Sequence, residues 1–170
     1  MTHRENNMNL VRYDTPVLSQ KLPDFDFVNP PIDPIEFAKT LADVMVVNGG
    51  VGLAANQLGL PYRVFAVASN PVLVCYNPKI VDYTKEDIVD LEEGCLTFPG
   101  LVMKIKRPKS IKIRYTEPNG AVQTKVYTGL TARIMQHEIE HLEGLRFFDG
   151  LGWYEKEKVK RWMKKNKRAA

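Results

Sequence analysis

Apolar residues recur at helical spacing early in the chain. Asp33 is followed directly by proline and, three residues later, by glutamate, which is the arrangement of a helix N-terminus. Phe37, Leu41 and Met45 then fall on one face, and Asn48-Gly49 ends the pattern. The sequence therefore predicts a helix between Asp33 and Asn48 that buries this apolar face.

The middle of the chain alternates between apolar and polar residues, as strands do. The alternating positions are Val64, Ala66, Leu73, Cys75, Ile80, Ile111, Ile113, Tyr115, Val122, Lys125 and Tyr127. Between the last two runs, Glu117-Pro118-Asn119-Gly120 is typical of a hairpin turn. Before the first helix, the segment Val17–Pro34 is rich in proline and aspartate, so we expect an extended surface segment.

These patterns indicate one α+β domain over residues 1–170, since no repeat or linker divides the chain. Short, mostly antiparallel strands are expected around a central helix, with an N-terminal helix, a flexible start over residues 1–9 and a basic helix over residues 153–166. No apolar run is long enough to cross a membrane. The polar start also lacks the core of a secretory signal, so we expect a cytoplasmic protein.

The net charge of +4 is concentrated at the C-terminus, where eight Lys or Arg residues stand against two acidic ones between Glu155 and Ala170. Such a segment is either a solvated helical face or a surface for an anionic partner such as RNA. Two cysteines are too few for a disulfide framework. Cys75 lies in an alternating run and is expected to be a buried thiol.

One helical segment carries candidate chemistry. In Gln136–Gly144, His137 and His141 are four residues apart, so on a helix both imidazoles can bind one divalent metal. Glu138 lies between them, where its carboxylate can reach a water on that metal without being a ligand. A chance occurrence on an exposed helix is the alternative. The histidines share their helix face with Ile134, which favours an inward-facing site.

A third ligand must come from elsewhere, because a longer histidine motif would need a histidine where Phe147 stands. Glu155 and Glu157 are available, although they belong to the basic C-terminal segment. Cys95 lies on a loop between glycine and proline, where a thiolate could face a cation. The residues alone leave these alternatives open.

A glycine-rich segment, Gly49–Gln57, follows the first helix. It lacks the Lys and Ser/Thr of a phosphate-binding loop. It is either a simple helix stop or a backbone edge with which a peptide can pair, ending in Gln57 as a hydrogen-bond donor.

Three stretches together resemble the signature motifs of the peptide deformylase family: Gly50–Gln57, Glu93–Thr97 and Gln136–Gly144. Their order and spacing also fit this family, which removes the formyl group from the N-terminal formyl-methionine of new polypeptides. The resemblance implies that Cys95, His137 and His141 bind one divalent metal per chain and leave a position for water. It implies ferrous iron, with zinc or nickel as substitutes, which suits a thiolate and two imidazoles.

The resemblance also implies individual roles. Glu138 would be the general base, while the side-chain amide of Gln57 and the backbone N–H of Leu96 would donate to the formyl oxygen. The backbone of a formyl-methionyl peptide would pair along an edge formed by Val51, Gly52 and Gly94. Its methionine side chain would enter an apolar slot with lining residues Val51, Leu130, Ile134 and the edge of the His137 ring.

Two positions depart from the family pattern: Glu140 replaces an aspartate, and Thr97 replaces the usual serine. Each adds carbon, so a contact around the metal could shift by about 1 Å. The basic helix resembles a ribosome-docking element of bacterial members, and we expect a monomer. The competing functions are a zinc endopeptidase with a glutamate ligand and a non-catalytic, metal-folded RNA- or ribosome-binding module.

Overall fold

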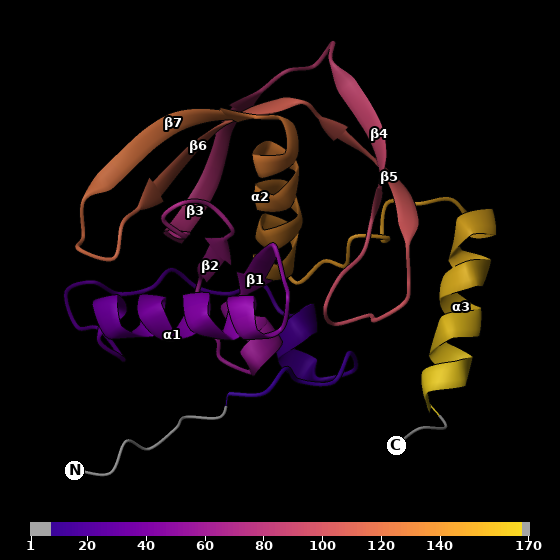
Figure 1. Ribbon diagram of the computed structural model, residues 1–170, viewed down its shortest axis with the longest axis horizontal. Coiled ribbons are helices and arrows are strands. Elements are labelled where there is room, and N and C mark those ends of the chain that lie inside the picture. The colour runs from indigo at the N-terminus through magenta and orange to yellow at the C-terminus, as the bar shows by residue number, and fades with distance from the viewer. Residues whose placement is uncertain (1–7, 168–170) are drawn as a thin grey trace.

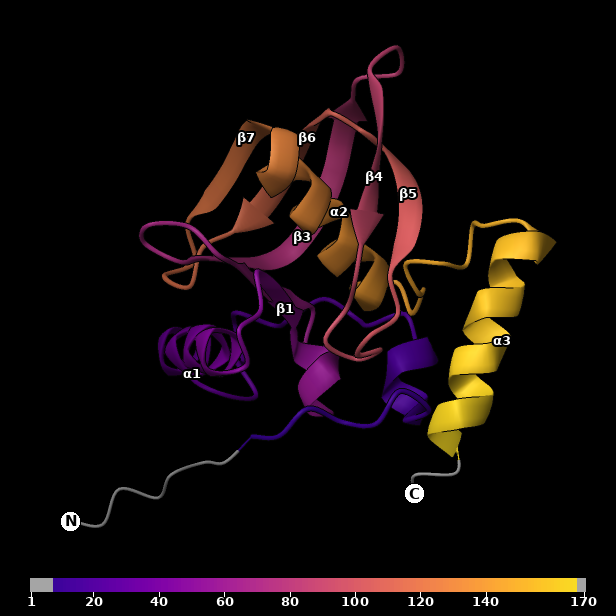
Figure 2. The same cartoon turned by 45° about the vertical axis from the view of Figure 1, so that its right-hand side comes forward.

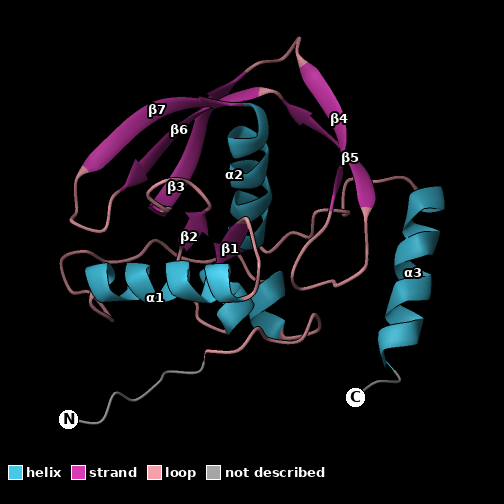
Figure 3. Cartoon of the chain, in the orientation of Figure 1, coloured by secondary structure: helices cyan, strands magenta, loops and turns pink. Residues whose placement is uncertain are grey.

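The computed structural model describes residues 8–167, so residues 1–7 of the flexible start lie outside the described part. Figure 1 shows the arrangement of the elements, and Figure 3 separates helices from strands. The helices are α1 (Pro34–Val47), α2 (Gly129–Leu142) and α3 (Trp153–Lys167), with short 3-10 turns η1 (Pro16–Ser19) and η2 (Ala55–Leu58). The strands are β1 (Gly52–Ala54), β2 (Val64–Val67), β3 (Leu73–Tyr83), β4 (Ile88–Glu93), β5 (Met103–Pro108), β6 (Ser110–Thr116) and β7 (Val122–Thr128).

The strands form two antiparallel sheets. Five strands pair in the order β1-β2-β3-β6-β7, while β4 and β5 form a separate hairpin. Figure 2 shows α2 between the five-stranded sheet and the β4–β5 hairpin, α1 beside β1, and α3 on the outer side of β5. The expected single α+β domain around a central helix is confirmed. Because β1 ends the five-stranded sheet, its outer edge has no strand partner among the described residues.

Helix α1 begins and ends as its sequence predicts. The Asp33 carboxylate accepts hydrogen bonds from the backbone N–H groups of Ile35 and Glu36, both at 2.9 Å, and Asn48 is the C-cap. Such an N-cap stabilises a helix by about 1 kcal/mol. The predicted face of Phe37, Leu41 and Met45 is fully buried.

Two local expectations are wrong because tertiary packing overrides the local pattern. Strand β2 buries all four of its side chains instead of alternating, since α1 covers one face and α2 the other. The segment Val17–Pro34 is not a surface segment throughout, because Leu18, Leu22 and Phe25 are buried. Leu22 also donates its N–H to the carbonyl of Leu142 at 2.9 Å, which fastens this segment to the end of α2.

Helix α2 is buried on nearly every side. All eight residues from 132 to 139 are buried, because the sheet lies on one side and the β4–β5 hairpin and η1 lie on others. Polar side chains on such a helix need partners inside the protein. None of the helices in residues 8–167 is both long enough and apolar enough to span a bilayer.

Candidate metal centre

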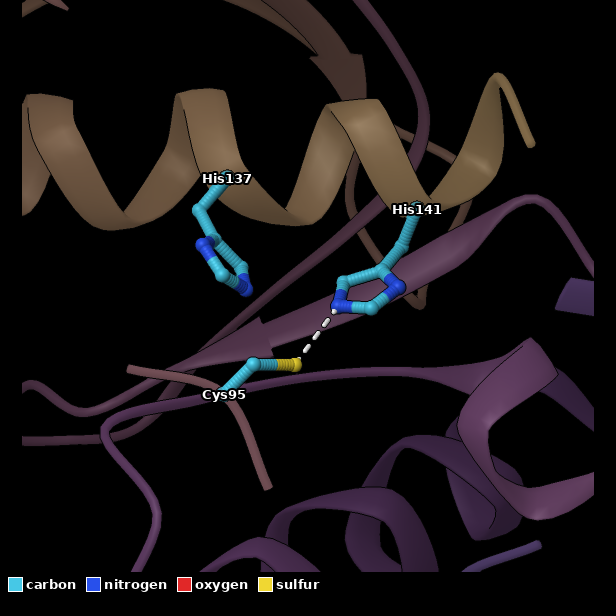
Figure 4. A group of neighbouring side chains, drawn as sticks. All are labelled: Cys95, His137 and His141. Atoms are coloured by element: carbon cyan, nitrogen blue, oxygen red, sulfur yellow. Dashed lines mark hydrogen bonds between the residues drawn. The ribbon is translucent and has the colours of Figure 1, made fainter. Parts of the chain in front are cut away.

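The structure brings one thiol and two imidazoles together. The ligand atoms of Cys95, His137 and His141 all lie within 4.8 Å of one another, and Cys95 Sγ is 3.2 Å from His141 Nε2. Figure 4 shows the two rings projecting from consecutive turns of α2 toward the Cys95 sulfur. The side chains therefore converge on one point from an interior helix and from the loop after β4.

Hydrogen bonds from other elements fix the ring of His137 and the main chain at His141. His137 donates its Nδ1–H to Glu93 Oε1 at 3.1 Å, an arrangement that fixes the ring and leaves Nε2 for a ligand on the other side. The main-chain carbonyl of His141 accepts from Asn56 Nδ2 at 2.6 Å, and that of Leu142 accepts from Arg63 Nη1 at 3.3 Å. Both ends of the histidine pair are thus anchored to other elements.

Glu93 belongs to a network of four charged side chains, of which Glu93, Arg107 and Arg133 are buried and Glu140 is partly exposed. Arg107 donates from Nε to Glu93 Oε2 at 2.6 Å and from Nη2 to Oε1 at 2.9 Å. Arg107 also grips both carboxylate oxygens of Glu140, at 2.9 and 3.0 Å. Arg133 adds a bond to Glu93 and one to the Ile105 carbonyl at 3.0 Å. Two arginines face two glutamates, and each of the four side chains has hydrogen-bond partners, as buried charges require.

Sequence reasoning missed Arg107 and Arg133, although one signal was present. In β5 the side chains of Met103, Ile105 and Arg107 are buried, while the intervening lysines are exposed. An arginine on the buried side of an alternating strand needs an anionic partner. At the Glu140 departure, the carboxylate accepts a paired contact from Arg107.

The ionisable groups strongly perturb one another. Burial would raise the pKa of Glu93, but hydrogen bonds from His137 and Arg107 lower it to about 2. Burial would lower the pKa of His137, but bonds to Cys95 and Glu93 raise it to about 10. Burial opposes ionisation of Cys95 as well, yet the charges of His141 and His137 hold its pKa well below the usual range. The thiolate is therefore the favoured form.

This donor set fits a divalent metal ion. A thiolate and two imidazoles suit iron, zinc and nickel, and a site with three protein ligands keeps a position for water. An unsatisfied buried group supports the assignment: Glu138 is only 4% exposed, and its Oε2 has no hydrogen-bond partner. Burial raises the pKa of Glu138 to about 7, although His137 and His141 act in the opposite direction. A carboxyl group with this pKa can accept and return a proton near neutral pH.

Gly52 allows Glu138 to occupy this position. A Cβ atom at residue 52 would clash with Glu138 Oε1 and would lie 2.7 Å from Ile134 Cγ2. The predicted backbone edge and the predicted base are therefore in direct contact. No larger residue fits at position 52 without displacing the carboxylate.

The side chain of Gln57 is fixed by two hydrogen bonds. Its Oε1 accepts from the Ala54 N–H at 2.9 Å, and its Nε2 donates to Thr97 Oγ1 at 3.0 Å. The amide nitrogen lies 3.7 Å from Cys95 Sγ, so the donor end of the amide faces the metal ligands. The threonine departure keeps the hydroxyl that holds Gln57.

The expected substrate-binding residues differ in exposure. Val51 is 56% exposed and Leu130 is 66% exposed, whereas Ile134 is buried in the core. Gly94 is exposed, directly before Cys95. Leu96 packs against the α1 side of the core. Two of these apolar side chains thus remain accessible, as a slot for an apolar group would need.

The alternative third ligands are not in the cluster. Among the described residues, the only group of His, Cys, Asp and Glu side chains close enough to hold one metal is Cys95, His137 and His141. Glu155 and Glu157 belong to α3 and contribute no ligand atom to it. Phe147 occupies the space beside His137, with ring centroids 5.4 Å apart.

Comparisons with known proteins agree with this site. The family model for polypeptide deformylase matches residues 7–157. A peptide deformylase of Borreliella burgdorferi is 36% identical over 156 residues, covering 90% of each chain. Peptide deformylase 1B of Arabidopsis thaliana, chloroplastic/mitochondrial, is 37% identical over 151 residues, covering 85% of this chain and 54% of the relative.

The fold is shared as well. A crystal structure of peptide deformylase from Plasmodium falciparum superposes with a TM-score of 0.85 at 28% identity, covering 95% of this chain and 96% of the other. The match therefore includes the motifs, nearly the whole length and the architecture. On these grounds, with Cys95, His137 and His141 gathered at one point, the chain belongs to the polypeptide deformylase family.

Proposed function

We propose that this chain hydrolyses the formyl amide of N-formyl-methionyl peptides at the Cys95–His137–His141 centre, with Glu138 as general base and acid. The observation that carries this assignment is the position of Glu138, a buried carboxyl group with a free oxygen beside the metal ligands. A divalent cation held by the three ligands would activate a water molecule and polarise the formyl oxygen. The remaining chemistry falls to the side chains of the protein.

Glu138 moves the proton in this scheme. Its carboxylate accepts a proton from the attacking water as the new C–O bond forms at the formyl carbon. As the C–N bond breaks, the same carboxyl group returns the proton to the departing amine nitrogen, so formate and a free N-terminus result. A pKa of about 7 suits both steps. The contact with Gly52 limits the movement of the carboxyl group.

Two donors would stabilise the negative charge that develops on the formyl oxygen. The Gln57 amide is supported by Ala54 and Thr97, with its nitrogen facing Cys95. Its two N–H groups donate to Thr97 Oγ1 and to Cys95 Sγ, and the one that faces Cys95 would donate to the substrate. The backbone N–H of Leu96 is the second donor. Losing one donor of this kind typically raises the barrier by about 3 kcal/mol.

The free edge of β1 would align the peptide. An extended chain can pair with a strand that ends a sheet, and β1 ends the five-stranded sheet. Val51, Gly52 and Gly94 would supply this edge. The methionine side chain would then lie against Val51 and Leu130, with Ile134 and the His137 ring behind them. The exposure of Val51 and Leu130 supports this slot.

The experiment that tests this function measures formate released from a formyl-Met peptide by protein prepared without oxygen. We expect turnover by the wild type and a loss of at least about 100-fold in kcat for Glu138→Gln, which keeps the shape of the side chain. Metal content measured in the same samples should not change. If the Glu138→Gln variant releases formate with the kcat of the wild type, Glu138 is excluded as the base.

The ligand assignment needs a separate control. Cys95→Ser should weaken metal binding and abolish turnover together, because a neutral hydroxyl is a poorer ligand than a thiolate. Cys75→Ser changes the other, buried thiol and should leave metal content unaltered. Retained metal and activity in Cys95→Ser would favour an endopeptidase-like site with a different third ligand.

We further propose Fe²⁺ as the native ion, with Zn²⁺ or Ni²⁺ as substitutes, and a monomeric, cytoplasmic enzyme. The donor set supports all three ions, so metal analysis after anaerobic purification is the test of the native one. The exposed basic side of α3 is proposed to dock on ribosomes. The exposed basic side chains are Lys158, Lys160, Arg161, Lys164, Lys165 and Lys167. Binding that survives their neutralisation, or that does not weaken with salt, would contradict this docking.

A further inference from the structure

The C-terminal half of α3 contacts the turn that carries Cys95. Trp162 donates its Nε1–H to the carbonyl of Pro99 at 2.8 Å, and its ring lies 5.4 Å from that of Phe98. The same turn is closed by a hydrogen bond from the Phe98 N–H to the carbonyl of Cys95 at 3.0 Å. Trp162 therefore holds the segment immediately after a metal ligand by both a polar and an apolar contact.

The contact continues to a second ligand through packed aromatic rings. Phe98 is 2% exposed, and its ring centroid lies 6.1 Å from that of Phe147. Phe147 in turn lies 5.4 Å from the His137 ring. These rings therefore form a packed row that leads from Trp162 to His137.

A cavity beside His141, the third ligand, is also lined by a residue of α3. Its volume is about 240 Å³, and its lining includes Leu18, Thr97, His141 and Met163. Thr97 is the residue that holds Gln57. Met163 follows Trp162 directly, so one turn of α3 reaches both the Cys95 turn and the surroundings of His141.

Trp162 and Met163 lie beyond the part of the chain that the family model matches, which ends at residue 157. We propose that Trp162 is a positioning residue of the metal centre: it fixes the Cys95 turn, and together with Met163 it keeps the three ligands in register. This inference rests on the proposed function of Cys95, His137 and His141 as ligands. It assigns α3 a role inside the molecule, separate from its exposed basic face.

The test compares metal release from full-length variants loaded with Co²⁺, whose absorption reports the thiolate bond. Trp162→Phe keeps an aromatic ring but removes the bond to Pro99. Trp162→Ala removes both contacts. Lys164→Ala is the matched control, because Lys164 is exposed on the same helix. The rate of transfer of Co²⁺ to excess chelator is measured for each, beside the unfolding midpoint of the metal-free form.

We expect release to accelerate severalfold in Trp162→Phe and by about 10-fold or more in Trp162→Ala, with an altered cobalt spectrum, while Lys164→Ala matches the wild type. Met163→Ala should change release in the same direction by a smaller factor. Should Trp162→Ala fail to fold, Trp162→Phe decides. Release and spectrum that equal those of the Lys164→Ala control would overturn the proposal.

The same samples separate this inference from the proposed function. Tight Co²⁺ binding without formate release would overturn the proposed reaction. The rates of Co²⁺ release from the variants would still decide the role of Trp162. Full activity with unchanged release in the Trp162 variants would overturn the positioning role alone. A wild type that binds no Co²⁺ would overturn both.

Discussion

Replacing Glu93 by glutamine should damage metal binding and folding together. Glu93 accepts hydrogen bonds from Arg107, Arg133 and His137, and its side chain is only 7% exposed. Glutamine has nearly the same shape but no charge, and its NH₂ group would face at least one of these donors. Arg107 would then keep only the carboxylate of Glu140, and Arg133 would keep only the backbone carbonyls of Ile105 and Val89.

The magnitude follows from this geometry. Removing one partner of a buried ion pair costs about 3 to 5 kcal/mol of unfolding free energy. At this burial little of that cost is screened by solvent. Losing the carboxylate partner of a metal-binding histidine typically weakens metal affinity by about 10- to 100-fold, or roughly 1.4 to 2.7 kcal/mol. We therefore expect a folded but much less stable variant with a metal dissociation constant raised by this factor.

The assays are denaturant unfolding of the metal-free protein and competition for Zn²⁺ with a chelating dye. Glu92→Gln is the matched control, because Glu92 is the preceding residue of β4 and its side chain is exposed. The reasoning is refuted if Glu93→Gln and Glu92→Gln agree within twofold both in the equilibrium constant of unfolding and in the dissociation constant for Zn²⁺.

The pH dependence adds a second check on the same variant. The pKa of Glu93 is lowered from 4.5 to about 2 in the folded protein, so its ionised form stabilises the fold above pH 4.5. This contribution is lost as the pH falls through about 2. The difference in unfolding free energy between wild type and Glu93→Gln should therefore be complete near neutral pH and shrink in strong acid. A difference independent of pH would contradict the assignment.

Three further predictions concern the metal centre. Gly52→Ala should lower kcat by at least about 10-fold with metal retained, because the new Cβ displaces Glu138; unchanged kcat would contradict the contact. Binding of Zn²⁺ near pH 7 should release a proton, because the pKa of His137 is about 10 in the metal-free protein. The affinity for Zn²⁺ should therefore rise as the pH approaches 10. Calorimetry in buffers of different ionisation enthalpy measures the number of protons released. In metal-free protein, iodoacetamide should modify Cys95 and spare Cys75, whose pKa burial raises; mass spectrometry of the peptides decides.

Local sequence determined the elements whose signals lie within a few residues. The Asp33 cap and the spacing of Phe37, Leu41 and Met45 defined α1, because capping and helical periodicity act within one or two turns. The spacing of His137 and His141 likewise placed both rings on one face of α2. The three motif segments, by their resemblance to known signatures, indicated the family from the sequence alone.

Tertiary structure alone decided what surrounds those elements. Glu93 and Arg133 are 40 residues apart, and Trp162 and Pro99 are 63 apart, so no periodic pattern along the chain reports these contacts. The burial of all four β2 side chains likewise depends on α1 and α2 covering both faces. Periodicity reports which face of an element is buried, whereas the partner across that face depends on how distant segments fold together.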